Sequence, residues 1–138
     1  MKILLLDSDL NKLKDDHFVK VNGELFAGHH YLIDMWEVNK LDDKNRINDL
    51  LLKSAKAAGV TVLHIHSHHF GDGQGISGIA ILAESHISIH TWPERNFVAC
   101  DIFMCGSTNP DLALAVLKKE IMPHKIVVKK VKRGLIKE

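Results

Sequence analysis

The feature that most constrains the fold is a run of short apolar segments in the middle of the chain, separated by tight turns. Strand-like stretches rich in apolar and β-branched residues are predicted at 60–68, 76–83, 86–91 and 97–104, and glycine or proline follows several of them. The connections between them are shorter than the dozen or more residues that a parallel crossover needs. These segments therefore predict neighbouring strands that pair antiparallel.

Two helices complete the pattern. Residues 42–58 place their apolar side chains on one helical face, and Gly59 follows as a stop signal. Asn109 followed by Pro110 is a strong helix start, because Asn caps and Pro fits the first turn. A last strand is expected at 125–131. Two helices on one face of an antiparallel sheet make an α+β two-layer sandwich, which is the fold class we expect.

The domain organisation is simple. A chain of 138 residues is long enough for one domain with a single core. We assign residues 24–138 to that domain, beginning with a strand-like segment at 25–38, and treat residues 1–23 as an N-terminal extension. Within the extension, a short strand at 2–6 and a loop or short helix at 7–16 are expected.

Composition excludes several classes of function. The chain has 18 basic and 17 acidic residues, so its net charge of +1 gives no reason to expect nucleic-acid binding or a membrane surface. No apolar run is long enough to span a bilayer. Cys100 and Cys105 are too few for a disulfide framework, and we expect thiols in a cytoplasmic protein.

The segment 75–106 carries the chemistry. It is mostly apolar, yet it contains several reactive or titratable side chains: Ser77, Glu84, Ser85, His86, His90 and Cys105. A buried polar group without a partner costs roughly 1–3 kcal/mol. So many of them in one core-like segment call for a functional explanation.

The run Ala-Glu-Ser-His-Ile-Ser-Ile-His-Thr-Trp-Pro-Glu at 83–94 resembles the self-cleavage motif of the short prokaryotic type of S-adenosylmethionine decarboxylase. Gly-Ile-Ser-Gly at 75–78 and Met-Cys-Gly at 104–106 resemble the family's two accompanying elements, in the same order and spacing. The resemblance covers residues 26–131, and the N-terminal extension departs from the short form.

The resemblance implies self-cleavage between Glu84 and Ser85. The Ser85 hydroxyl would attack the carbonyl carbon of Glu84, and elimination and hydrolysis would leave a pyruvoyl cofactor on a chain of residues 85–138. By analogy His90 is the base for the elimination, since imidazole titrates near neutrality, and Ser77 assists the ester-forming step. Cys105 is the implied proton donor in the later decarboxylation.

The resemblance also implies the substrate contacts and the assembly. Phe70 matches the aromatic residue that stacks on the adenine of S-adenosylmethionine, and Glu94 sits where a carboxylate could meet the ribose. Independently of the resemblance, an adenine site needs an aromatic shelf, for which Phe70 or Trp92 is the candidate. The product would feed spermidine synthesis. Because the family forms its sites at a subunit interface, we expect a homodimer of cleaved protomers.

Two other functions stay open. Homologues with the same cofactor decarboxylate arginine or ornithine, and the processing residues do not discriminate between these substrates. An uncleaved homologue that regulates an active partner is the other alternative, although intact Ser85, His90 and Cys105 argue against it.

Several residues carry a plainer interpretation. His64, His66 and His68 alternate and would share one strand face as a zinc set, but no accompanying ligand motif supports this, and we predict no metal site. Cys100 lies in mid-strand and is interpreted as a small buried apolar residue. Ser85 and His90 are an odd number of residues apart, so in one straight strand their side chains face opposite sides of the sheet. For His90 to act on Ser85, we therefore expect Ser85 to lie in a bend before the strand begins.

Overall fold

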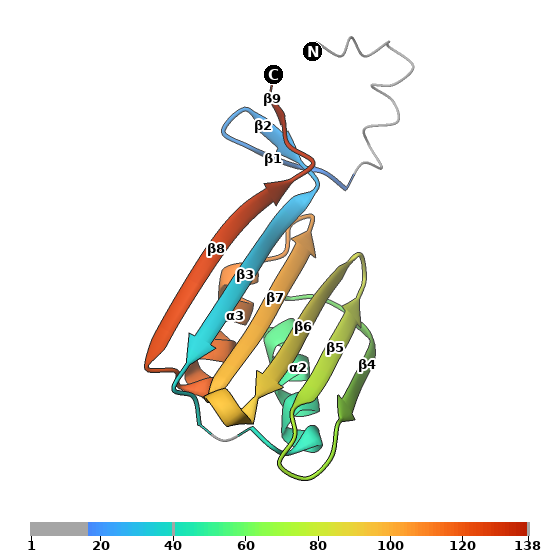
Figure 1. Cartoon of the computed structure of the whole chain (residues 1–138). Helices are drawn as coiled ribbons and strands as arrows, with labels where there is room; N and C mark the ends of the chain where they lie inside the picture. The colour runs from blue at the N-terminus through green and yellow to red at the C-terminus, as the bar shows by residue number, and fades with distance from the viewer. Residues whose placement is uncertain (1–16, 40, 138) are drawn as a thin grey trace.

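The computed structural model describes residues 17–39 and 41–137, and its main feature is a six-stranded antiparallel sheet with two helices on one face (Figure 1). The strand order is β4-β5-β6-β7-β3-β8. The elements are β3 (Gly28–Trp36), α2 (Lys44–Ala57), β4 (Val62–His69), β5 (Ile76–Leu82), β6 (Ser85–Trp92), the 3₁₀ turn η2 (Pro93–Arg95), β7 (Phe97–Cys105), α3 (Pro110–Ile121) and β8 (Lys125–Arg133). The predicted α+β two-layer sandwich is confirmed.

A second, small sheet lies beyond the end of the main sheet where β3 begins and β7 ends (Figure 1). It joins β1 (Val19–Val21), β2 (Glu24–Phe26) and β9 (Ile136–Lys137) in antiparallel pairs. The single strand expected at 25–38 is therefore two, β2 and β3. The segments expected at 2–6 and 7–16 lie outside the described residues.

The helices begin and end where their capping residues indicate. Asp43 caps α2 by accepting a hydrogen bond from the Asn45 N–H at 2.8 Å, so the helix begins two residues later than the predicted start at 42. Asn109 caps α3 through the Asp111 N–H at 3.0 Å, as expected. The apolar faces of both helices pack on the sheet, and side chains such as Ile47 and Leu51 are fully buried.

Side chains alternate between the two faces of the sheet. In β6 and β7 one set faces the helices and is buried, and the other set is partly or fully exposed on what we call the open face. In Figure 1 both helices lie on the opposite side of the sheet from the open face. Within the described residues, neither helix has the length and apolar character needed to cross a bilayer.

Candidate active site

The expected cleavage bond lies at the tip of the β5–β6 hairpin. Leu82 pairs with Ser85, so Ala83 and Glu84 alone make the turn. Glu84 has φ of 65°, a left-handed conformation that costs a residue with a Cβ about 1 kcal/mol or more. The bend expected at Ser85 is thus one residue earlier, and Ser85 is already the first residue of β6. The backbone strain sits immediately before the Glu84–Ser85 peptide bond.

Ser85 lies beside Cys105. The Ser85 hydroxyl oxygen accepts a hydrogen bond from the backbone N–H of Cys105 at 3.1 Å, which orients the hydroxyl at the end of the sheet. Gly106 then reverses the chain in a left-handed conformation (φ 67°), and Thr108 donates to the Cys105 carbonyl at 2.8 Å. The Met-Cys-Gly element therefore fixes Cys105 next to the expected cleavage site.

The two cysteines differ in environment. Cys100 is 5% exposed on the helix side, which confirms its interpretation as a buried apolar residue. Cys105 is half-buried. Burial raises the pKa of the Cys105 thiol; the hydrogen bond with Ser85 opposes this, and the Glu84 carboxylate adds to it. Cys105 is therefore a protonated thiol at neutral pH, the form that a proton donor needs.

Ser77 and His90 meet at the other end of the same hairpin. They are direct cross-strand partners in β5 and β6, and the Ser77 hydroxyl lies 2.9 Å from Nδ1 of His90. The glycines of the Gly-Ile-Ser-Gly element permit close packing here. A Cβ on Gly75 would lie 2.2 Å from the carbonyl oxygen of Thr91, and one on Gly78 would press on side chains of α2. The element thus has a packing role beside any chemical one.

The predicted substrate contacts gather at this second end. A cavity of about 330 Å³ is lined by Phe70, Gln74, Gly75, Ser77, His90, Thr91, Trp92 and Glu94. Phe70 is 61% exposed, and its ring meets the His68 ring edge-on with centroids 4.7 Å apart. Two aromatic surfaces, a carboxylate and an imidazole are therefore available around one hollow.

The structure does not bring the two groups of residues together within one chain. Ser85 and His90 are five residues apart in β6, which at the usual rise of a strand is about 16 Å. Ser85 is buried with the helix-facing set, whereas His90 is exposed on the open face. A single chain therefore separates the cleavage-site pair, Ser85 and Cys105, from the pocket residues.

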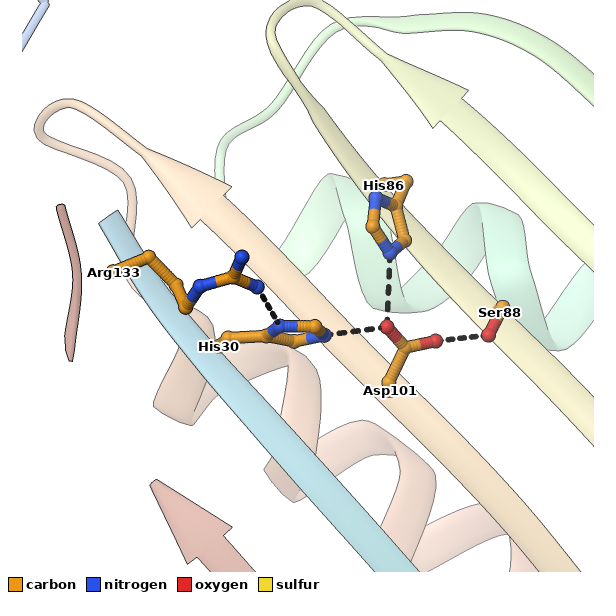
Figure 2. A network of polar contacts seen from close by, with 5 residues as sticks. All are labelled: His30, His86, Ser88, Asp101 and Arg133. Carbon is orange, nitrogen blue, oxygen red and sulfur yellow. Dashed lines mark hydrogen bonds and ion pairs between the residues drawn. The ribbon is translucent and has the colours of Figure 1, made fainter. Parts of the chain in front are cut away.

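Sequence reasoning missed a polar network on the open face between these two ends (Figure 2). It is centred on Asp101 and includes His30, His86, Ser88 and Arg133. The signal available in the sequence was a lone carboxylate in the otherwise apolar segment 97–104, since buried carboxylates need partners.

The three alternating histidines are placed as their spacing predicts. His64, His66 and His68 are exposed on the open face of the edge strand β4, and the rings of His64 and His66 stack with centroids 6.4 Å apart. Among the described residues, the group with ligand-atom spacing suitable for a metal is His30, His86 and Asp101 instead.

Comparison with known proteins places the chain in a family. A family model described as S-adenosylmethionine decarboxylase matches residues 29–134. A protein of Methanococcus maripaludis named S-adenosylmethionine decarboxylase proenzyme is 40% identical over 112 residues, covering 79% of this chain and 91% of the relative. One of the same name from Thermomicrobium roseum is 36% identical over 110 residues, covering 79% and 95%.

A solved structure agrees. The crystal structure of the adenosylmethionine decarboxylase from Aquifex aeolicus superposes with a TM-score of 0.73 at 32% identity, covering 82% of this chain and 95% of that one. The resemblance found in the sequence is thereby confirmed, and the chain belongs to the S-adenosylmethionine decarboxylase family.

Proposed function

We propose that this chain is a proenzyme that cuts itself between Glu84 and Ser85, converts Ser85 into a pyruvoyl group and then decarboxylates S-adenosylmethionine. The observation that carries the proposal is the cleavage-site geometry. The Glu84–Ser85 bond follows a left-handed, strained residue, and the Ser85 hydroxyl is oriented by the Cys105 N–H. The decarboxylated product would serve as the aminopropyl donor for spermidine.

The processing steps follow from the chemistry of serine. The Ser85 hydroxyl adds to the carbonyl carbon of Glu84, and the peptide C–N bond breaks, so the chain is joined through an ester and the Ser85 amine is free. Removal of the Ser85 α-proton expels the Glu84 carboxylate. The dehydroalanine that is left takes up water and releases ammonia, which leaves the ketone of a pyruvoyl group.

For the second reaction the pyruvoyl group would supply a carbonyl that condenses with the substrate's amine, with loss of water, and so provide an electron sink for the pair released when carbon dioxide leaves. Cys105 then has to return a proton to the substrate carbon. Its raised pKa keeps the thiol protonated at neutral pH, and its place beside Ser85 puts that proton next to the new group.

Substrate recognition is assigned to the cavity at the other end of the hairpin. Phe70 and Trp92 offer aromatic surfaces for an adenine, which stacks well on such rings, and Glu94 offers a carboxylate for ribose hydroxyls. A basic amino acid would instead need a carboxylate at the far end of a narrower pocket. The pair of aromatic residues therefore favours the nucleoside over arginine or ornithine.

A homodimer resolves the separation between the cleavage site and this cavity. When two copies meet with their open faces in contact and their strands running in opposite directions, the Ser85 end of each sheet lies opposite the Ser77 end of the other. The open face also exposes apolar side chains suited to an interface: Leu32, Ile79, Ile81, Trp92 and Val127. His90 of one copy would then act on the backbone α-proton of Ser85 in the other.

The free thiols of Cys100 and Cys105 fit a reducing compartment, and we propose the cytoplasm as the site of action.

The intact mass of the purified protein under denaturing conditions tests the proposal, with Ser85→Ala as the control. Two fragments meeting at residues 84 and 85, the smaller blocked at its start by a ketone, are expected for the wild type and a single chain for the control. A wild-type chain that stays uncut after long incubation would refute self-processing. Assays of the cut protein with S-adenosylmethionine, arginine and ornithine then decide the substrate.

A further inference from the structure

The polar network on the open face has no part in the steps described so far. We propose that Asp101 is a positioning residue, which holds the start of β6, and with it the group formed from Ser85, against the strand that carries Cys105. This role depends on the self-processing proposed above. It assigns a function to three side chains, those of Asp101, His86 and His30.

The contacts converge on one carboxylate (Figure 2). Oδ2 of Asp101 lies 2.6 Å from Nε2 of His30 and 2.9 Å from Nε2 of His86, while Ser88 donates to Oδ1. Nδ1 of His30 lies 3.1 Å from the Arg133 guanidinium. These five side chains come from β3, β6, β7 and β8, so the network ties four strands together across the open face.

The hydrogen-bond partners determine which ring nitrogens of His30 and His86 carry a proton. A guanidinium only donates, so Nδ1 of His30 accepts from Arg133, and its Nε2–H donates to Asp101. An ionised carboxylate only accepts, so His86 also donates through Nε2–H. Burial of Asp101 opposes its ionisation, but hydrogen bonds from Ser88, His30 and His86 outweigh this and hold the pKa of Asp101 below its usual range.

The same proton positions argue against a metal ion at this cluster. The two imidazole nitrogens and the carboxylate oxygen lie within 4.8 Å of one another, close enough for a metal. A metal ion would need the Nε2 lone pair of His30, which moves its proton to Nδ1, where the Arg133 guanidinium already donates. The arrangement therefore favours a hydrogen-bonded carboxylate over a metal centre.

His86 connects this network to the reaction. Its backbone nitrogen forms the amide with the carbonyl of Ser85, so it directly follows the pyruvoyl group in the processed chain. Cleavage converts the turn of a hairpin into a free strand end, and free ends fray unless they are tied down. The side chain of His86 is the first one after the new end, and Asp101 holds it.

Asp101 is well placed to set the geometry of the site. Asp101 and Cys105 lie on the same strand and the same face, four residues apart. Holding His86 on Asp101 therefore fixes the strand that bears the pyruvoyl group relative to the strand that bears the proton donor. Displacement of reacting groups by about 1 Å can cost about a hundred-fold in rate, so such an anchor affects catalysis without contact to the substrate.

The test compares two variants of His86 by intact-mass time courses of processing and by kcat and KM per pyruvoyl group. His86→Leu removes the donor, and we expect processing and kcat to fall by about ten-fold or more, with KM changed by less than about two-fold. His86→Gln keeps an N–H donor at a similar reach and should recover most of both rates. Asp101→Ala, which leaves both imidazoles without their acceptor, should behave like His86→Leu.

Matched controls separate positioning from general stability. His124→Leu changes an exposed histidine in the loop between α3 and β8, and Asp49→Ala removes an exposed carboxylate of α2, on the opposite side of the sheet from the open face. Both should process and turn over as the wild type does. Melting temperatures of all variants are measured on a Ser85→Ala background, where no chain is cut.

Each outcome decides something. Wild-type rates for His86→Leu and Asp101→Ala would overturn the positioning role while leaving self-processing intact. Loss of rate only in proportion to loss of melting temperature, with no recovery in His86→Gln, would show that the network merely stabilises the sheet. A wild-type chain that is never cut would overturn both proposals.

Discussion

Two inactive variants should restore each other when mixed, because the structure separates Ser85 from His90 within one chain. The two residues are about 16 Å apart along β6 and on opposite sides of the sheet, whereas proton abstraction requires contact within about 3 Å. His90→Ala chains keep the serine to be converted, and Ser85→Ala chains keep the proposed base. In the proposed dimer neither variant alone would form a complete site, but a mixed dimer would have one complete and one empty site.

The expected yield follows from counting dimers. In an equimolar mixture whose dimers, once formed, exchange slowly compared with processing, about half of the His90→Ala chains are in mixed dimers, so about half become cut. A nine-fold excess of Ser85→Ala chains raises that share to about nine in ten. Intact mass distinguishes the two chains when one carries a tag, and only the His90→Ala chain should yield fragments.

The first control establishes that subunits of the two variants associate with each other. Co-purification through the tag must show that mixed dimers form, and a His90→Ala, Ser85→Ala double variant should rescue nothing. Uncut His90→Ala chains within proven mixed dimers would refute the reasoning, as would self-processing of a single chain at a rate independent of dilution below the dimer's dissociation constant.

Four further predictions concern Cys105 and the β5–β6 hairpin that carries the cleavage site. Cys105→Ala should still cut itself but lose about a hundred-fold or more of its decarboxylation rate per pyruvoyl group, measured as carbon dioxide release. Burial raises the pKa of the Cys105 thiol, so this proton donor stays protonated above the pH at which an ordinary thiol ionises. We therefore expect kcat to be constant up to about pH 8.5 and to fall at higher pH. A fall of kcat centred at about pH 7 would contradict this. Glu84→Gly relieves the left-handed backbone strain at this residue. On a Ser85→Ala background it should raise the free energy of unfolding in denaturant by up to about 1 kcal/mol, and with Ser85 intact it should slow processing about five-fold. Faster processing would count against a role for strain. Gly75→Ala forces a Cβ against the Thr91 carbonyl and should cost at least about 2 kcal/mol in the same unfolding assay.

The sequence predicted the elements well because their signals are local. Alternation marked the strands, and Asn109 marked the start of α3. The bend expected at Ser85, which was to bring it to the side of His90, was wrong, because the turn ends at Glu84 and Ser85 already pairs with Leu82 in the sheet. The break between β2 and β3 was missed, although Gly28 marks it, since a Cβ there would lie 2.3 Å from the Met104 carbonyl.

The Asp101 network could not be predicted from local sequence patterns, because its residues are far apart in the chain. It joins His30 to Asp101 across 71 residues and His86 to Asp101 across 15, and it depends on the register of four strands. A shift of one residue in any of these strands would turn the side chain to the other face. A lone carboxylate in an apolar strand indicates that partners are needed, but only the register decides which partners it finds.

The division of the site follows from the architecture itself. A two-residue turn places Ser85 at one end of the β5–β6 hairpin, and the pairing of Ser77 with His90 belongs to the other end, so no side chain of ordinary length spans the gap. A single short sheet with one open face cannot fold its own ends together. In the proposed dimer, a two-fold axis that reverses the strands would bring the Ser85 end of one sheet to the Ser77 end of the other without any additional chain. The same symmetry would create two sites at once. Because the strand end freed by cleavage would then lie in the interface, anchoring it through His86 and Asp101 matters to both subunits.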